Sequence, residues 1–276
     1  MPILNKDMQV CISLAARPSN LGTRFHNFLY DELDLNFIYK AFTTNDLEGA
    51  VRGIRALNIR GCSVSMPFKE AIIEFVDVMA PSALAIDSVN TVVNDDGVLT
   101  ASNTDFEAVL SLLVERAIDP SLTVLLRGSG GMAKAVAAAF KQAGFSAVTI
   151  QARNAAAGQA LATKLCFKFV ADDALAAKPQ NFDILVNVTP IGMTGANESD
   201  LAFAPELIER ARVIFDVVAF PSETPLIVAA RTLGKTVITG AEVISLQAAL
   251  QFEAYTGVAL TVDQVSRASA FSRPPA

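Results

Sequence analysis

The chain has 276 residues, of which 52% are hydrophobic and 18% charged, so it can bury the core of one large domain or two medium ones. The net charge is −6 and there is no long basic run, which argues against a nucleic-acid partner. Apolar runs are too interrupted to span a membrane, and no signal-peptide pattern opens the chain. We therefore expect a cytoplasmic protein that acts on a small molecule.

The first part of the chain alternates β-rich runs with helical patterns. Strands are expected at 9–14, 36–40 and 61–65, and the helices between them carry apolar residues at spacings of three and four. Pro67 suits the first turn of a further helix, which extends to Val76. This alternation predicts a mostly parallel sheet.

A hairpin is expected next. Its strands lie at 88–93 and 98–101, joined by the four-residue loop Asn94-Asp95-Asp96-Gly97. Thr104-x-x-Glu107 has the pattern of a capping box, so a helix should begin there and run through Glu115.

A second alternation starts at Leu122 and predicts a dinucleotide-binding domain over 107–239. Its helices are expected at 133–143 and 155–165, and the tail from Gly240 contains a further helix at 245–255. The strands of this domain are expected at 122–126, 147–150, 167–170, 183–188, 213–218 and 237–239.

A glycine-rich turn, Gly128-Ser129-Gly130-Gly131-Met132-Ala133, connects a buried strand to a helix. Such a turn brings the backbone close to a pyrophosphate and directs the helix N-terminus at the negative charge. Gly128 permits the tight turn, Gly130 permits the close approach, and Ala133 is small enough for close packing of helix and strand. The pattern predicts a bound dinucleotide and an NAD(P)-dependent dehydrogenase; the alternative is a structural turn without a ligand.

The end of the second strand bears on the choice between NAD and NADP. NAD sites usually offer an acidic residue to the ribose hydroxyls, but the sequence from Ile150 to Asn154 has none. Arg153 can pair with a 2′-phosphate through its forked guanidinium. These residues favour NADP and leave NAD open; the alternative for Arg153 is a solvated surface arginine.

The cysteines and the single histidine show no metal-binding spacing, so we expect no metal site. Cys11, Cys62 and Cys166 are scattered in apolar contexts and are expected to be buried, reduced thiols. His26 lies in a helical stretch, where a surface or packing role is favoured over a role in a Ser-His-Asp triad.

The motifs of the chain resemble those of the shikimate dehydrogenase family. They occur in the family's order and span nearly the whole chain. The motifs are Ser63-Val64-Ser65-Met66-Pro67-Phe68-Lys69, Ser88-Val89-Asn90-Thr91, Asn103-Thr104-Asp105, the glycine turn, Asn187-Val188-Thr189-Pro190-Ile191-Gly192-Met193, Thr224-Pro225-Leu226 and the stretch from Gly240 to Gln247.

The resemblance implies an α/β fold with two domains. An N-terminal α/β substrate-binding domain would cover 1–106, with 240–276 packing back on it, and a Rossmann-type domain would cover 107–239. The implied activity is the NADP-dependent interconversion of shikimate, or a related polyhydroxy cyclic acid such as quinate, and its 3-dehydro ketone. Such an enzyme belongs to aromatic amino acid biosynthesis, and we expect a monomer or homodimer.

The resemblance also implies that Lys69 and Asp105 are the catalytic pair. Hydride removal from an alcohol needs a base at the oxygen, and a cation helps as negative charge develops there. The helix dipole disfavours a cation at Lys69, whereas a nearby Asp105 would favour one, so the net effect on its pKa stays open. The alternatives are a solvated Lys69 and an Asp105 that only caps its helix.

Further contacts follow from the same resemblance. Ser65, Asn90 and Gln247 match residues that hold substrate hydroxyls. The cofactor contacts extend beyond the glycine turn and Arg153 to Asn187, Thr189, Val217 and Gly240.

The chain departs from the family in three places, one of which is the Asn-Arg-Thr cofactor motif, which reads Ala152-Arg153-Asn154 here. The Ser-x-Ser motif that grips the substrate carboxylate is missing, although Ser19, Asn20, Thr23 or one of the arginines of this stretch, Arg17 and Arg24, could replace it. Ala219 stands where the family usually has a tyrosine. These departures resemble the shikimate dehydrogenase-like branch.

Two other functions remain open from the sequence. One is a catalytically weak or silent NAD(P)-binding regulatory protein that kept the fold. The other is a different enzyme of similar architecture, such as a methylene-tetrahydrofolate dehydrogenase, which the Asn-Thr-Asp motif and Gln247 disfavour.

Overall fold

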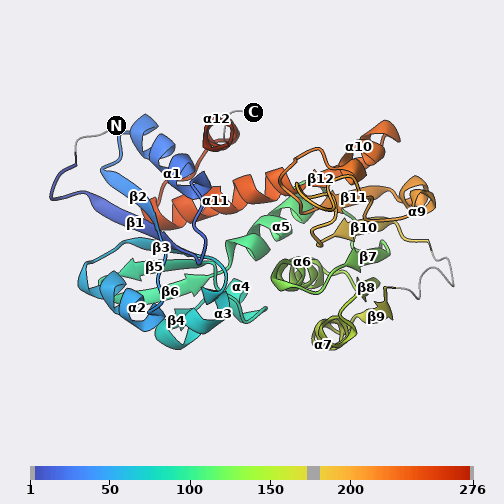
Figure 1. Cartoon of the computed structure of the whole chain (residues 1–276), viewed down its shortest axis with the longest axis horizontal. Helices are drawn as coiled ribbons and strands as arrows, with labels where there is room; N and C mark the ends of the chain where they lie inside the picture. The colour runs from blue at the N-terminus through green and yellow to red at the C-terminus, as the bar shows by residue number, and fades with distance from the viewer. Residues whose placement is uncertain (1–3, 173–180, 274–276) are drawn as a thin grey trace. The chain divides into compact units, whose positions relative to one another are not determined.

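The computed structural model describes residues 4–172 and 181–273. The chain divides into two compact units (Figure 1). Unit 1 comprises 1–104 and 245–276, and unit 2 comprises 105–244. Each unit is built on a six-stranded sheet with helices packed against it, so the fold class is α/β. Within the described part of the chain, no helix is long and apolar enough to cross a membrane.

The sheet of unit 1 is mixed, with strand order β2-β1-β3-β5-β6-β4. Strands β2, β1 and β3 are parallel, whereas β5 is antiparallel to both its neighbours. The strands are β1 (Gln9–Leu14), β2 (Phe37–Phe42), β3 (Gly61–Val64), β4 (Val78–Met79), β5 (Thr91–Asp95) and β6 (Val98–Ser102). The helices that begin in or belong to this unit are α1 (Leu21–Glu32), α2 (Leu47–Ala56), α3 (Phe68–Ala71), the 3-10 helix η1 (Ile72–Phe75), α4 (Pro81–Leu84), α5 (Thr104–Glu115) and α12 (Val262–Ser272).

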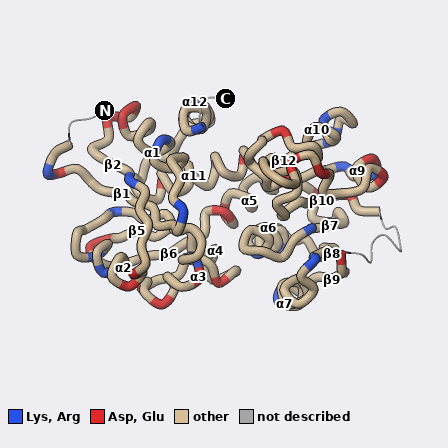
Figure 2. Tube along the Cα trace, viewed as in Figure 1, with Lys and Arg blue, Asp and Glu red and all other residues tan. Residues whose placement is uncertain are grey.

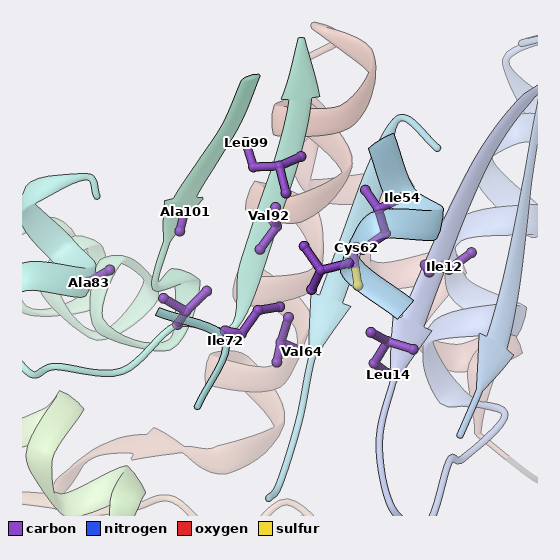
Figure 3. Packing of buried hydrophobic residues seen from close by; sticks show 12 residues of the cluster. Ile12, Leu14, Ile54, Cys62, Val64, Ile72, Ala83, Val92, Leu99 and Ala101 are labelled. Carbon is purple, nitrogen blue, oxygen red and sulfur yellow. The ribbon is translucent and has the colours of Figure 1, made fainter. Parts of the chain in front are cut away.

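Helices cover both faces of this sheet. Alternate side chains of a strand point to opposite faces, so neighbouring residues of β1 enter different clusters. Ile12 of β1 joins a cluster with α2 and η1, seen in Figure 3, where Ile54 and Cys62 belong to the same packed group. Its neighbour Cys11 joins a second cluster with α1, α12 and α11 (Gly240–Thr256). The central strands are therefore buried on two sides.

Helix α11 lies close to the sheet of unit 1. A Cβ atom at Gly61 would stand 2.2 Å from the ring of Tyr255, so only glycine lets this strand accept the aromatic side chain. Arg60 adds a hydrogen bond next to this contact, since its Nε donates to the Tyr255 carbonyl at 2.9 Å.

The sheet of unit 2 is parallel throughout its pairings, with order β12-β11-β10-β7-β8-β9. Counted from β7, this is the order of a doubly wound dinucleotide-binding sheet. The strands are β7 (Val124–Arg127), β8 (Val148–Ala152), β9 (Lys168–Ala171), β10 (Ile184–Asn187), β11 (Val213–Asp216) and β12 (Thr236–Thr239), and the helices between them include α6 (Gly131–Gln142), α7 (Ala155–Leu165), α9 (Pro205–Arg210) and α10 (Pro225–Thr232).

The helices of unit 2 cover both faces of its sheet. From β7 the chain adds strands toward one edge, and from β10 it adds strands toward the other. Because strand–helix–strand crossovers are right-handed, helices of the two halves lie on opposite faces. The apolar cluster of α9 and α10 with β10 and β11 fills one of these faces. The carboxyl ends of β7 and β10, adjacent in the middle of the sheet, form the switch point.

Two local predictions were wrong. The hairpin closes through a two-residue turn, not a four-residue loop, because Asp95 pairs with Val98 and both Asp96 and Gly97 have positive φ, as a type I′ turn requires. The helix expected from Pro67 to Val76 is a short α-helix followed by a 3-10 turn, and Val76 is extended. A buried Ile72 anchors this turn in the core.

The cysteines and His26 fit their predictions only in part. Cys11 and Cys62 are buried, and burial raises the pKa of the Cys11 thiol to about 12. Cys166 is exposed, which contradicts the prediction, because it is the left-handed residue that ends α7. His26 has a packing role: it is 0% exposed and stacks on Tyr39 at 4.4 Å between ring centroids.

Charged residues are distributed over both units. Figure 2 shows basic and acidic positions interspersed along the trace of each unit. Within the described residues, no group of three His, Cys, Asp or Glu side chains could hold a metal ion.

The buried His26 predicts that stability falls in mild acid. Burial lowers the pKa of His26 to about 3, whereas the unfolded chain binds the proton near pH 6.5. As pH falls through 6.5, the unfolded state gains a proton that the folded state excludes. His26 should therefore lower the free energy of unfolding by about 2 kcal/mol between pH 7.5 and 5.0. Urea unfolding of His26→Phe at these two pH values should show a correspondingly smaller loss than the unsubstituted protein. Equal losses in the two proteins would contradict this account.

Candidate active site

The glycine turn of unit 2 lies at the switch point. Gly128 follows β7 with φ +134°, and a Cβ atom there would stand 2.7 Å from the Val188 side chain and 2.9 Å from its carbonyl oxygen. The Gly128 N–H donates to the Gln151 carbonyl at 2.8 Å, which ties the turn to β8. Glycine at this position is therefore required by the fold itself.

Gly130 and Gly131 differ from Gly128 in this respect. A Cβ atom at either position would meet no atom within 4 Å, and Gly130 has φ −81°, which any residue can adopt. Both are exposed. The packing of the protein does not explain these glycines, whereas close approach of a ligand to the backbone does.

The start of α6 suits an anion. This helix has 12 residues, its N-cap Gly130 provides no side-chain cap, and its first turn contains no acidic residue. The exposed N–H groups and the helix dipole therefore favour a negative charge here. Ala133 is 0% exposed, as expected for the small residue that packs between helix and strand.

Asn187, Thr189, Val217 and Gly240 surround the carboxyl ends of neighbouring strands. Asn187 ends β10 and pairs in register with Arg127, the residue before the glycine turn. Its Oδ1 accepts from the Thr189 hydroxyl at 2.6 Å. A Cβ atom at Gly240 would stand 2.3 Å from the Val217 carbonyl oxygen, so these two chain segments meet only because residue 240 is glycine.

Asp216 joins this group, although no role was predicted for it. Its carboxylate is fully buried and accepts from Asn187 Nδ2 at 3.0 Å, from the Val218 N–H at 3.1 Å and from the Thr224 hydroxyl at 2.7 Å. Burial raises the pKa of Asp216, and these three donors oppose the rise. The signal in the sequence was an acid at the end of an otherwise apolar strand.

The residues near Arg153 offer no carboxylate at the end of β8. Arg153 is exposed, and the next residue, Asn154, caps α7 by accepting from the Ala157 N–H at 3.1 Å. The acid that follows β9 is Asp172, and both its oxygens accept from Arg127 at 3.1 and 3.0 Å. That carboxylate is therefore already paired with a cation.

In unit 1, Ser65, Lys69 and Asn90 lie in connected segments. Ser65 is exposed just after β3, and Lys69 is half-buried on α3. The Lys69 carbonyl accepts from the Val89 N–H at 2.8 Å, and the Asn90 carbonyl accepts from the Val64 N–H at 2.8 Å. The segment that carries Asn90 is thus bonded on one side to α3 and on the other to β3.

Asn90 and Gln247 meet through Thr104. Asn90 is 3% exposed, and its Oδ1 accepts from the Thr104 N–H at 2.7 Å and from the Thr91 hydroxyl at 2.8 Å. The Thr104 hydroxyl lies 3.2 Å from Asn90 Oδ1 and 3.3 Å from Gln247 Oε1. Asp105, the first residue of unit 2, follows Thr104 directly and is half-buried.

The residues expected to replace the missing Ser-x-Ser motif lie between β1 and the first turn of α1. Ser19 and Asn20 are exposed, and Asn20 makes no side-chain cap, whereas the Thr23 hydroxyl is buried without a partner among the described residues. Arg24 packs on Phe271, and its Nε donates to the Phe271 carbonyl at 3.0 Å.

Several known proteins are similar to this chain. The model of the shikimate dehydrogenase substrate binding domain matches residues 19–92. A shikimate dehydrogenase-like protein of Haemophilus influenzae is 53% identical over 98% of this chain and 99% of its own length. A shikimate dehydrogenase (NADP(+)) of Streptococcus pyogenes is 35% identical over 92% of this chain and 94% of its own length.

A solved structure supports the same relationship. Shikimate 5-dehydrogenase of Thermus thermophilus, in complex with NADP(H) and shikimate, is 28% identical to this chain. The match covers 96% of this chain and all of that one, with a TM-score of 0.84. The resemblance seen in the motifs is therefore confirmed: the chain belongs to the shikimate dehydrogenase family.

Proposed function

We propose that the chain is an NADP-dependent oxidoreductase that interconverts shikimate, or a related polyhydroxy cyclic acid, and its 3-dehydro ketone. Unit 1 binds the substrate and unit 2 binds the dinucleotide. The observation that carries the proposal is the glycine turn, where the fold requires Gly128 but leaves Gly130 and Gly131 against open space. The Streptococcus pyogenes and Thermus thermophilus relatives support the choice of NADP and shikimate.

The residues of unit 2 fit NADP. Gly130, Gly131 and the start of α6 hold the pyrophosphate, helped by Ser129 and Met132 of the same turn. Arg153 is exposed after β8, and its forked guanidinium pairs with the 2′-phosphate. The carboxylate of Asp172 is already paired with Arg127. Asn187, Thr189, Val217 and Gly240 line the rest of the site, and when bound NADP supplies a nicotinamide that accepts a hydride.

Lys69 and Asp105 manage the proton of the substrate hydroxyl. The oxidised alcohol must lose this proton as the hydride leaves its carbon, so a base and a cation at the oxygen both lower the barrier. We assign these tasks to Lys69 and Asp105 together, because the family motifs that carry them are intact.

The other polar residues of unit 1 hold the substrate. Asn90, Ser65 and Gln247 bind its hydroxyls, and Ser19, Asn20 and Thr23 take the place of the carboxylate grip. Ala219 is a buried methyl group that cannot make the hydrogen bond of a tyrosine. A lost hydrogen bond of this kind commonly costs about 1–3 kcal/mol, so we expect weaker turnover of shikimate than a full set of contacts would give.

Steady-state kinetics with shikimate and quinate, each with NADP and NAD, test the proposed function. Reduction of NADP by at least one of these acids is the expected result. Tight NADP binding without turnover of any such acid would contradict the proposal and favour the silent regulatory protein.

The glycine turn gives a paired prediction. Gly130→Ala should leave thermal stability unchanged, because its methyl group meets no protein atom, but should raise the Kd for NADPH about tenfold or more. Gly128→Ala should lose roughly 1–3 kcal/mol of stability through its positive φ and its contact with Val188. Fluorescence titration and thermal unfolding measure the two effects, and unchanged NADPH affinity in Gly130→Ala would count against the dinucleotide site.

The catalytic pair gives a second prediction. Lys69→Ala and Asp105→Asn should each lower kcat about 100-fold or more, because general acid–base catalysis contributes this much. Their affinity for NADPH should match the unsubstituted protein, since neither side chain belongs to the glycine turn. A kcat within a fewfold of the unsubstituted value in both variants would remove the pair from the chemistry.

Arg153 gives a third prediction. Arg153→Ala should raise the KM for NADP about tenfold or more and leave the KM for NAD nearly unchanged, because only NADP carries the 2′-phosphate. The matched control is Arg231→Ala, because Arg231 is an arginine of α10 that pairs with Glu223. Equal changes for both cofactors would assign Arg153 a role other than selectivity.

A further inference from the structure

Gln251 is a buried amide on α11 that was given no role from the sequence. It lies one helical turn after Gln247 and is 3% exposed. Its Nε2 lies 3.0 Å from the Thr91 hydroxyl, 3.2 Å from the Asn90 carbonyl oxygen and 3.3 Å from the Ser63 hydroxyl. A buried amide with polar neighbours on β3, on β5 and on the residue just before β5 is a fixed element of the fold and not a solvated helix residue.

Two backbone groups determine the direction of the hydrogen bonds around Asn90. A carbonyl oxygen can only accept, so the end of the Gln251 amide that faces the Asn90 carbonyl must be the donor Nε2. A backbone N–H can only donate, so the end of the Asn90 amide that faces Thr104 must be the acceptor Oδ1.

The hydroxyl of Thr91 lies between these two amides. It is 3.0 Å from Gln251 Nε2 and 2.8 Å from Asn90 Oδ1. Since Oδ1 carries no hydrogen, the hydroxyl donates its proton to Asn90 and accepts from Gln251. The result is a directional chain of hydrogen bonds that runs from Gln251 through Thr91 to Asn90.

This chain of hydrogen bonds determines which end of the Asn90 amide is available to a ligand. Its Oδ1 is used by Thr91 and Thr104, so the other end of the amide, Nδ2, is the end left for substrate. That end presents only donors. It matches an oxygen that accepts a hydrogen bond, such as the oxygen of a hydroxyl or of a ketone.

We propose that Gln251 is a positioning residue that, through Thr91, holds the Asn90 amide with Nδ2 directed at an acceptor oxygen of the substrate. The inference rests on the proposed function, because Asn90 is there assigned to the substrate. Without the N–H of Gln251, the Thr91 hydroxyl can turn toward its other neighbour, the Thr104 hydroxyl at 3.3 Å. Asn90 Oδ1 then loses one of its donors and keeps only the N–H and the hydroxyl of Thr104, so the amide is held less firmly.

The effect should appear in KM and not in kcat. Asn90 holds a hydroxyl of the bound substrate in the ground state and in the transition state alike, and loss of such uniform binding raises KM alone. Gln251→Met keeps the volume of the side chain and removes its hydrogen bonds. Thr91→Val keeps the shape and removes the hydroxyl, and Thr91→Ser is the conservative control that retains it.

The decisive experiment is a double-mutant cycle on the KM for shikimate. Gln251→Met and Thr91→Val should each raise this KM about tenfold. The KM of the double variant should also be raised only about tenfold, because both changes break the same chain of hydrogen bonds. The kcat and the KM for NADP should stay within about twofold, and Thr91→Ser should resemble the unsubstituted protein. Gln159→Met, the same change on the exposed face of α7, should alter nothing.

Three results would overturn the inference. The first is a roughly hundredfold increase in the KM for shikimate in the double variant, which indicates independent effects. The second is a Thr91→Ser variant that is as impaired as Thr91→Val. The third is an equal change in the KM values for shikimate and NADP, which indicates a general structural defect.

A second measurement needs no substrate. If Gln251 and Thr91 belong to one chain of hydrogen bonds, the loss of unfolding free energy in the double variant should be smaller than the sum of the losses in the two single variants. Absence of turnover with shikimate and quinate in the unsubstituted protein would contradict the proposed function, and this unfolding cycle would still decide the inference. Additive losses would show that no such chain exists.

Discussion

The hydrogen bond from the Thr104 N–H to Asn90 Oδ1, 2.7 Å long, connects the parts of unit 1 on which the proposed substrate site depends. Its acceptor belongs to a residue whose backbone bonds to β3 and β6, and its donor is the first residue of α5. The same hydrogen bond fixes the orientation of the Asn90 amide and the start of the helix that carries Asp105. A shift of either partner would therefore alter the proposed binding residue Asn90 and the proposed catalytic residue Asp105 together.

Unit 2 uses the same principle at its own sheet edge. Asn187 is also a buried amide at the end of a strand, and Asp216 determines its orientation because a carboxylate can only accept from Nδ2. The opposite end accepts from Thr189. In each unit, a neighbouring group with only one hydrogen-bonding role fixes an asparagine in place. Side chains held in this way need little reorganisation when a ligand binds.

Much of this organisation could be predicted from the sequence because it depends on local patterns. The strands and helices of unit 2 follow from the alternation of apolar runs, and the turn at Gly128 follows from its position between strand and helix. Local patterns could not reveal Gln251, whose partners Ser63 and Thr91 lie far away in the chain. Nor could they place Cys166 at the surface, since a residue in an apolar stretch can still end a helix. Contacts of this kind depend on tertiary packing.

We propose that this chain removes a hydride from a ring alcohol and passes it to NADP. Shikimate labelled with deuterium at the carbon that becomes the ketone provides the most direct test. The account predicts NADPH that contains one deuterium, measured by mass spectrometry, and loss of this product in Lys69→Ala. No reduced cofactor, or NADPH without the label, would contradict it.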